Sequence, residues 1–404
     1  YSILKKFYSI FCVFIVAAKR TPFGTMGGVF TNKSATDLAI VATTSALQSA
    51  GLKPEKVDNI IFGHVLALSA SDGGFLARHV ALKSGIPIEK PACSINRLCG
   101  SGFQSIVSGA QSIMTGESKI VLAGGAENMS QSPFVVRNIR FGTTLGQKYE
   151  FEDSLWQGLL DTYCNLPMGM TAEKLGSQYG IKRQEVDEFA LRSQQLWKAG
   201  NDAGHFKEEL APVTVTVKRQ EVVVNTDEHP RPQTTAQSLA KLPPVFKKDG
   251  LVTAGSASGI CDGAGAVILA SEEAVKTEGL KPLARLVGCC AVGVDPSIMG
   301  IGPAPAIKQL LKVTNKTMND IELVEINEAF GAQTLACAKE LDLNINKLNV
   351  NGGAIAVGHP LAASGSRITA HLVHELRRRN SGKFGIGSAC IGGGQGIAIM
   401  VEAL

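Results

Sequence analysis

The segment around which the chain is organised is Asn96–Gly116, with the sequence NRLCGSGFQSIVSGAQSIMTG. Its apolar side chains recur at the three- and four-residue spacing of one helical face, and Gly116 stands where a helix C-terminal glycine belongs. A buried helix is therefore expected to begin near Cys99. Gly100 and Gly102 lack Cβ atoms where the chain turns into this helix, which lets another segment or a ligand come close to the cysteine.

Cys99 suits two interpretations, a nucleophile or a small cysteine that only packs. The unpaired N–H groups and the positive dipole at a helix start favour its thiolate form. Ionising half of an ordinary thiol at pH 7 requires about 2 kcal/mol of stabilisation. A helix terminus supplies only ~0.3 to 1 kcal/mol, so a nucleophile here needs a second group, which we expect to be a histidine.

Length and charge bound the class of protein. A chain of 404 residues with 45% apolar and 6% aromatic residues has enough core for two or three globular domains. The net charge of +5 comes from 40 basic and 35 acidic residues, which are dispersed along the chain. This balance is too mild for a dedicated nucleic-acid-binding protein, and it suits a polyanionic small ligand.

The nine cysteines are irregularly spaced and form no Cys-x-x-Cys pair, which indicates free thiols in a reducing compartment and no zinc site. Cys289 and Cys290 are adjacent and could form a strained disulfide. We expect instead that they point to opposite faces of a strand. The chain also lacks a P-loop, a Gly-x-Ser-x-Gly motif and a complete Gly-x-Gly-x-x-Gly motif.

The N-terminus has the composition of a targeting segment. Residues 1–36 contain five basic residues and no acid, as a transit peptide does. The apolar run Ile10–Ala18 could also be read as part of a secretory signal, but it is far shorter than the ~18 residues that span a membrane. We predict targeting for residues 1–12 and a first core strand within 13–24.

Strands and helices are predicted to alternate through the first part of the chain, and a less regular part follows. Strands are expected at 14–17, 57–65, 92–95, 120–123, 213–217, 323–326 and 384–388, and helices at 34–50, 74–85, 170–179, 183–203 and 364–379. Thr36-Asp37 is expected to cap the first helix. Residues 128–258 hold both tryptophans and most of the mixed-charge stretches, so we predict an inserted subdomain there. Within it, Arg231 lies between two prolines, either as a solvated loop charge or as a phosphate contact.

The second half repeats the order of the first. Cys99 is followed by Ser101-Gly102, a helix and a strand, and His359 is followed by Ser364-Gly365, a helix and a strand. An internal duplication would place Cys99 and His359 at equivalent turns. Packing of the two halves about a pseudo-twofold axis could bring both turns to one pocket.

Three further segments carry groups that could react or bind. His359 lies in the turn Gly358-His359-Pro360, Cys390 opens the glycine-rich turn Cys390–Gly394, and Asn327-Glu328-Ala329-Phe330 presents an amide and a carboxylate at a strand end. Backbone N–H groups of the glycine-rich turn could bind an oxyanion. Each segment alone also has an ordinary structural interpretation.

Taken together, these segments resemble the thiolase family. The motifs are Arg97–Gly102, Asn327–Phe330, Asn351–Ala354 with Gly358–Pro360, and Cys390–Gly394, in family order and at family spacing. The resemblance extends from about Val13 to the C-terminus. Within the family, the first motif is most similar to that of the mitochondrial enzymes of fatty-acid β-oxidation.

The resemblance implies thiolytic cleavage of a 3-ketoacyl-CoA by CoA, giving acetyl-CoA and a shortened acyl-CoA. Cys99 would attack the 3-keto carbon while His359 takes its proton, and Cys390 would protonate the leaving enolate and later deprotonate the incoming CoA. The resemblance implies no tightly bound cofactor and no metal, with coenzyme A as a substrate.

The family also implies groups that stabilise charge and bind CoA. His359 and a water held by Asn327 would stabilise the enolate oxygen, and the N–H groups of Cys99 and Gly392 the tetrahedral intermediate. Ser258 would contact the pantetheine arm and Arg231 the CoA nucleotide. Ala362 and Cys261 differ from common family residues. Ala362 would strain the His359 turn if that position needs positive φ.

The implied fold is an α/β thiolase fold, a layered α/β/α/β/α sandwich of two duplicated halves with an inserted loop domain. We predict a targeting segment at 1–12, an N-terminal half at 13–127 that is completed by about 259–280, the insertion at 128–258, and a C-terminal half at 281–404. The insertion would bind CoA and make oligomer contacts, most simply in a homotetramer, with a dimer as the alternative. The expected location is the mitochondrial matrix, with no membrane span and no nucleic-acid partner.

Two other functions remain open at this point. One is a short-chain acetoacetyl-CoA thiolase that acts in the condensing direction. The other is a catalytically silent CoA-binding protein on the same fold, against which the presence of Cys99, His359, Asn327 and Cys390 argues.

Overall fold

The computed structural model describes residues 13–380 and 384–404, so the predicted targeting segment 1–12 lies outside the described residues. The elements of the N-terminal half are β1 (Val13–Arg20), β2 (Gly24–Thr25), α2 (Ala35–Ala50), β3 (Asn59–Gly63), α3 (Leu76–Lys83), β4 (Ala92–Ile95), α4 (Ser101–Met114), β5 (Ile120–Asn128), β12 (Cys261–Ser271) and α9 (Glu272–Thr277). The elements of the C-terminal half are β13 (Ala284–Gly293), α10 (Pro303–Thr314), β14 (Ile321–Ile326), α11 (Gly331–Glu340), α12 (Ala354–Val357), α13 (Ser364–Arg379), β15 (Phe384–Ile391) and β16 (Gln395–Ala403).

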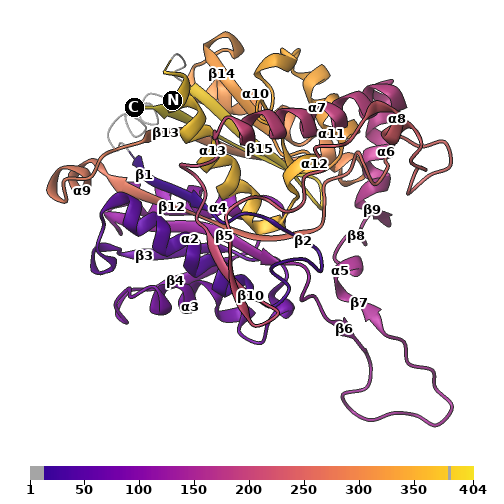
Figure 1. The fold of residues 1–404 in the computed structure, drawn as a ribbon, viewed down its shortest axis with the longest axis horizontal. Coiled ribbons are helices and arrows are strands. Elements are labelled where there is room, and N and C mark those ends of the chain that lie inside the picture. The colour runs from indigo at the N-terminus through magenta and orange to yellow at the C-terminus, as the bar shows by residue number, and fades with distance from the viewer. Residues whose placement is uncertain (1–12, 381–383) are drawn as a thin grey trace.

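Between β5 and β12 the chain forms short strands and helices, several of which lie to one side of the two halves, whereas the hairpin at 213–224 packs against the N-terminal half (Figure 1). These elements are β6 (Phe134–Val135), β7 (Glu152–Asp153), α5 (Ser154–Gln157), β8 (Leu160–Asp161), β9 (Leu166–Pro167), α6 (Met168–Gln178), α7 (Arg183–Asp202), β10 (Val213–Val217), β11 (Gln220–Val224) and α8 (Ala236–Ala240). The chain between β6 and β7 projects from the body as a long finger (Figure 1).

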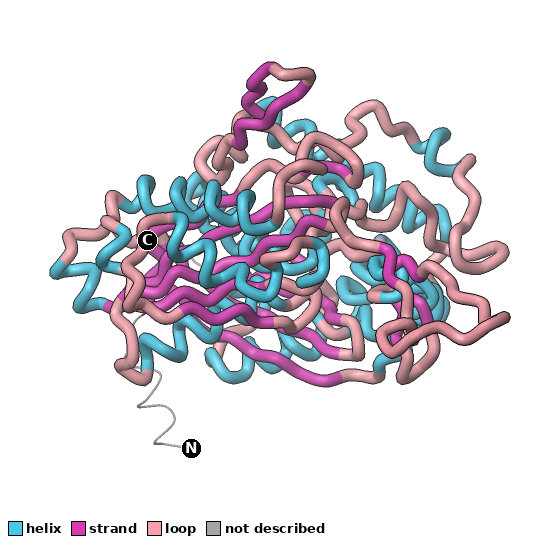
Figure 2. Tube along the Cα trace, turned by 90° about the horizontal axis from the view of Figure 1, so that it is seen from below, coloured by secondary structure: helices cyan, strands magenta, loops and turns pink. Residues whose placement is uncertain are grey.

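The strands of the two halves pair in the same order. In the N-terminal half β3 pairs in parallel with β5, β5 antiparallel with β12, and β12 antiparallel with β1. In the C-terminal half β14 pairs in parallel with β15, β15 antiparallel with β16, and β16 antiparallel with β13. A short pairing of β1 with β13 joins the two sets of strands into one sheet, which Figure 2 shows running through the molecule between helices.

Helices form three layers around the strands. The central layer is α4 and α13, whose buried residues Phe103 and Ile368 share one apolar cluster with strand residues of both halves, including Val121 and Ile399. Helices α2 and α3 pack on the outer face of the N-terminal strands, and α10 and α11 on the outer face of the C-terminal strands. The predicted α/β/α/β/α sandwich is therefore confirmed.

Several predicted elements differ from the structure in instructive ways. Strand β5 continues past Ala123 to Asn128, because its glycine-containing end pairs with β12 along its whole length. The cap of α2 is Ser34, whose hydroxyl accepts the Asp37 N–H while the Asp37 side chain accepts the Ser34 N–H, so the predicted cap at Thr36-Asp37 was wrong.

The two adjacent cysteines behave as predicted. Cys289 and Cys290 lie in β13 as free thiols, and they pack against the central and the outer apolar cluster respectively. Opposite faces of one strand therefore hold the two side chains.

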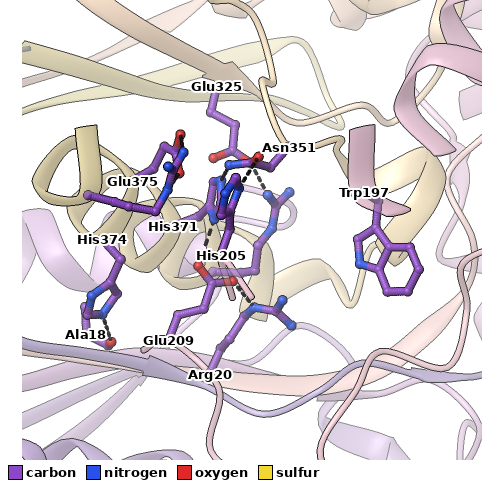
Figure 3. A network of polar contacts seen from close by, with 12 residues as sticks. Ala18, Arg20, Trp197, His205, Glu209, Glu325, Asn351, His371, His374 and Glu375 are labelled. Atoms are coloured by element: carbon purple, nitrogen blue, oxygen red, sulfur yellow. Dashed lines mark hydrogen bonds and ion pairs between the residues drawn. The ribbon is translucent and has the colours of Figure 1, made fainter. Parts of the chain in front are cut away.

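A buried polar network joins the inserted segment to both halves (Figure 3). Arg20 of β1 contacts Glu209 at 2.6 Å, and Glu209 also contacts His371 of α13 at 2.8 Å. A second carboxylate, Asp227, lies 2.6 Å from the Arg20 guanidinium. The neighbouring charges raise the pKa of His371 and hold that of Glu209 at about 2. This cluster fixes the inserted segment in register with β1 and α13.

Within residues 13–380 and 384–404, no helix combines the length and the apolar composition needed to cross a membrane.

Candidate active site

A cavity of about 330 Å³ lies where the two halves and the inserted segment meet. Cys99, Ser258, His359 and Cys390 all line it. The remaining lining side chains are mostly apolar, and several come from the inserted segment, namely Trp156, Leu159, Leu160, Met168, Val245 and Phe246. The structure thus brings together groups that lie far apart in the sequence, from Cys99 to Cys390.

Cys99 precedes the first turn of α4, which begins at Ser101 with Gly100 as its N-cap. The predicted close approach of another segment is confirmed, because a Cβ on Gly102 would lie 2.5 Å from the carbonyl oxygen of Ala362. The chain before the cysteine is held by a left-handed Leu98, with φ of 46°, whose N–H donates to the side chain of Asn96.

The protonation of Cys99 differs from the simplest prediction. Burial raises the pKa of its thiol to about 11, although the N–H groups of Gly392 and of Cys99 itself point at the sulfur and lower it. Desolvation of the charged form therefore outweighs the helix start. At this pKa roughly one molecule in ten thousand carries a thiolate at pH 7. A nucleophilic Cys99 would consequently need a base during the attack itself.

His359 has the properties of that base. Burial and the positive charge of Arg367 lower the pKa of the imidazole to about 3, so the ring is neutral at physiological pH. Its Nδ1 lies 2.6 Å from Oγ of Ser364, the first residue of α13. When Nδ1–H donates to this hydroxyl, the lone pair is left on Nε2. The backbone of the turn is held by the His359 N–H, which donates to the Gly259 carbonyl at 2.9 Å.

Asn327 touches the histidine directly. Its Nδ2 lies 3.4 and 3.3 Å from Nδ1 and Nε2 of His359, and the residue is fully buried at the end of β14. Its Oδ1 has no hydrogen-bond partner among the described residues. Asn327 does not line the cavity, so in this structure it lies behind the histidine.

Cys390 lies near the end of β15 with only 1% of its surface exposed. Burial and the neighbouring Cys99 raise the pKa of its thiol well above the usual value. It packs with Met299 and Ala329, so it too rests as a thiol. The turn that follows it supplies the Gly392 N–H that faces the Cys99 sulfur.

The two predicted CoA contacts lie in different surroundings. Ser258 lines the cavity, and its N–H donates to the Ala329 carbonyl at 3.0 Å. Arg231 is exposed and does not line the cavity, although its backbone N–H is fixed by the side chain of Gln194.

The backbone strain considered above for Ala362 is absent from the structure. Ala362 lies in the short helical turn Leu361–Ala363 and does not have positive φ, so alanine is not strained there. The left-handed residue of this loop is Gly358, with φ of 95°. A Cβ at Gly358 would collide with the sulfur of Cys261.

The sequence did not lead us to three features of this site. Ser364 was assigned only to a helix start, although a hydroxyl five residues after a candidate base at such a start is a local signal for an orienting group. Glu127 is a carboxylate at the end of an otherwise apolar strand, and it had been given no role. The apolar wall from the inserted segment has no local signal, because it depends on how that segment docks.

Comparisons with known proteins agree on one family. The profile described as Thiolase, N-terminal domain matches residues 13–273, and the one described as Thiolase, C-terminal domain matches residues 280–403. The chain is 60% identical to the human protein named 3-ketoacyl-CoA thiolase, mitochondrial, over 97% of this chain and 98% of that one. It is 44% identical to an acetyl-CoA acetyltransferase of Syntrophomonas wolfei, over 97% of this chain and 99% of the other.

Solved structures agree with the sequence comparisons. The crystal structure of human mitochondrial 3-ketoacyl-CoA thiolase superposes with a TM-score of 0.96 at 59% identity, covering 98% of this chain and 99% of that one. A structure of the human enzyme in complex with CoA gives a TM-score of 0.95 at 59% identity, covering 98% of each chain.

Proposed function

Because this chain belongs to the thiolase family, we propose that it cleaves 3-ketoacyl-CoA with CoA to acetyl-CoA and an acyl-CoA shortened by two carbons, the last step of fatty-acid β-oxidation. The observation that carries this function is the meeting of Cys99, His359 and Cys390 on one apolar cavity. Coenzyme A is the substrate that the human relative is seen to bind.

In the first half-reaction, Nε2 of His359 takes the proton of Cys99 as the sulfur attacks the 3-keto carbon. The N–H groups of Cys99 and Gly392 already face the sulfur, so the oxyanion of the tetrahedral intermediate forms beside two donors. The bond between C2 and C3 then breaks, leaving the acyl group on Cys99. The departing enolate of acetyl-CoA takes its proton on carbon from Cys390.

In the second half-reaction, the Cys390 thiolate removes the proton of the incoming CoA thiol. The CoA sulfur attacks the acyl group on Cys99, and the released Cys99 sulfur recovers its proton from His359. All protons are returned within the cycle, so the chemistry requires no tightly bound cofactor. We assign Asn327 to the enolate oxygen together with His359, through a water molecule, as the family resemblance implies.

Two binding roles complete the proposal. Ser258 is assigned to the pantetheine arm, because it lies on the cavity wall. Arg231 is assigned to the CoA nucleotide outside the cavity, because it is exposed on a segment whose backbone is fixed. We assign residues 128–258 to this binding role as an inserted loop domain. The N-terminal half then comprises residues 13–127 and is completed by 259–280, and the C-terminal half comprises residues 281–404.

The cavity wall favours a chain-cleaving enzyme over a short-chain condensing one. An acetoacetyl group needs little apolar room, whereas the apolar side chains around Trp156 and Phe246 can take up a longer acyl chain. The similarity to an acetyl-CoA acetyltransferase keeps the condensing reaction as the second candidate. Steady-state thiolysis of 3-ketooctanoyl-CoA and acetoacetyl-CoA decides between them. We expect the higher kcat/KM with the eight-carbon substrate, and a higher value with acetoacetyl-CoA would favour the second candidate.

We also propose a homotetramer in the mitochondrial matrix, with a dimer as the alternative state. The finger between β6 and β7 carries fully exposed Phe141 and Leu145, and the N-terminal half exposes Phe75 and Ile88 near the edge strand β4. Such apolar surfaces are typical of subunit contacts. The mitochondrial location is supported by relatives with that word in their names. Mass photometry of the protein, and import of a reporter that carries residues 1–36, test the two assignments.

A further inference from the structure

Glu127 is a fully buried carboxylate at the end of β5 that the reaction scheme leaves without a role. Its oxygens accept three backbone N–H groups, from Leu66 at 2.9 Å, Val65 at 3.2 Å and Ala362 at 3.3 Å. The first two belong to the loop after β3, and the third belongs to the turn that follows His359. One side chain of the N-terminal half therefore holds a loop from each half.

The backbone of Ala362 is also confined on its carbonyl side. A Cβ on Gly125 would lie 1.9 Å from the Ala362 carbonyl oxygen, and a Cβ on Gly102 would lie 2.5 Å from it. The N–H of Ala362 is thus bound by Glu127, while the carbonyl of the same residue, in the next peptide group, lies against two glycine backbones. Because Gly102 is in the first turn of the helix that follows Cys99, the packing of Ala362 against it fixes the His359 turn relative to the nucleophile.

His64 completes the surroundings of the carboxylate. Its Nδ1 lies 3.0 Å from the Gly73 carbonyl oxygen, so Nδ1 carries a hydrogen. Its Nε2 lies 3.5 Å from Oε1 of Glu127 and has no hydrogen-bond partner among the described residues. Two buried acceptors that face each other can be satisfied by one shared proton. Burial and the nearby Asp262 raise the pKa of Glu127 to about 7, in line with a carboxyl group that can hold such a proton.

We propose that Glu127 is a positioning residue of the reaction, which fixes the backbone of Ala362 through its N–H and so holds His359 in register with Cys99. The inference rests on the proposed thiolase function. It assigns Glu127 a role through the reach of its side chain rather than through negative charge. An anion at this place would oppose the Cys99 thiolate, since Glu127 raises the pKa of that thiol.

Two substitutions of Glu127 separate the effect of side-chain length from the effect of negative charge. Glu127→Gln keeps the length, since its oxygen in the place of Oε2 can accept the Ala362 and Val65 N–H groups and its amide can donate to Nε2 of His64. It loses only the acceptor of the Leu66 N–H, which lies on the loop away from His359. Glu127→Asp keeps the charge but is one methylene shorter, so it cannot contact both loops. We expect kcat to stay within threefold of wild type for Glu127→Gln and to fall at least tenfold for Glu127→Asp, with KM within twofold in both. Ala362→Pro removes the same hydrogen bond from its other partner, so we expect the same fall in kcat.

The control is Asp58→Asn. Asp58 also accepts two backbone N–H groups, of Lys119 and Ile120, but at the opposite end of β5 and away from the cavity lining. We expect this variant to lose stability without losing kcat. A wild-type kcat in Glu127→Asp, or an equal loss in Glu127→Gln and Glu127→Asp, would overturn the positioning role. Failure of the thiolase function itself would show separately, as wild-type protein that forms no acyl adduct on Cys99.

Discussion

Burial sets the chemistry of the site at the scale of single residues. It holds Cys99 as a thiol, with a pKa of about 11, and His359 as a neutral imidazole, with a pKa of about 3. A thiolate–imidazolium pair is therefore not the resting state, and in the proposed reaction the proton moves only as the sulfur attacks. Sequence reasoning identified both residues from their motifs, but it could not predict the balance between the helix start and desolvation, which depends on tertiary packing.

The first prediction concerns the pH dependence of Cys99 reactivity. Because the pKa of this thiol lies above its ordinary value, the thiolate fraction should increase with each pH unit up to about 11. Alkylation of Cys99 by iodoacetamide, followed on its peptide by mass spectrometry, should thus accelerate steadily from pH 7 to 9.5. A plateau below pH 8.5 would show that the resting thiol is more acidic than its burial allows.

The second prediction concerns the hydroxyl that orients the histidine. Ser364→Ala removes the acceptor of the His359 Nδ1–H and leaves that group buried without a partner. We expect kcat to fall about tenfold with little change in KM, because Nε2 no longer presents its lone pair in one fixed direction. Ser366→Ala is the matched control, since the Ser366 hydroxyl donates to the Ala363 carbonyl and does not touch the histidine. Equal kcat values in the two variants would argue against the orienting role.

At the scale of elements, sequence patterns predicted the bounds of those strands and helices that depend mainly on local interactions. Strands β4 and β10 and helix α13 have the predicted bounds, because alternation and helical spacing are properties of the segment itself. The end of β5 was predicted too short, because its glycines resemble a turn until the pairing with β12 is known. The cap of α2 was misplaced by two residues, since Ser34, Thr36 and Asp37 all have suitable side chains.

The third prediction tests that cap. Ser34→Ala removes one side of the reciprocal hydrogen bonds with Asp37, so we expect a loss of about 1 kcal/mol in the free energy of unfolding. Activity should not change, because α2 lies on the outer face of the N-terminal strands. Ser49→Ala, near the exposed end of the same helix, should leave the free energy of unfolding within about 0.5 kcal/mol of wild type. A larger loss in this control than in Ser34→Ala would place the stabilising contact elsewhere.

At the scale of the whole molecule, the duplication could be read from the sequence, whereas the docking of the insertion could not. The repeated order of turn, Ser-Gly, helix and strand placed Cys99 and His359 at equivalent turns, and both line the cavity. The apolar wall around Trp156, and the exposed position of Arg231 outside the cavity, follow from contacts between distant segments. Such contacts leave no periodic pattern in one chain.

The fourth prediction concerns the network that holds the insertion in place. Arg20 is 1% exposed and contacts both Glu209 and Asp227, so Arg20→Met leaves Asp227 buried without its cation and leaves Glu209 with His371 alone. We expect a loss of about 3 to 5 kcal/mol in the free energy of unfolding, measured by chemical denaturation at pH 7.

The network also has a defined pH dependence. The pKa of Glu209 is lowered in the folded state, so its stabilisation is present above the ordinary glutamate pKa and is lost as the pH falls toward about 2. The pKa of His371 is raised in the folded state. The stabilisation that His371 contributes is therefore present below the ordinary histidine pKa and is lost as the pH rises through the raised value. A loss below 1 kcal/mol in Arg20→Met would contradict the role given to the network.

The central claim, that Cys99 carries the acyl group, is tested most directly by intact-protein mass spectrometry. Wild-type protein and Cys99→Ala are each incubated with a 3-ketoacyl-CoA in the absence of free CoA and then weighed. We expect a single acyl adduct on the wild type, located on the peptide that contains Cys99, and no adduct on the variant. A folded wild type without an adduct, or an adduct that persists in Cys99→Ala, would contradict it.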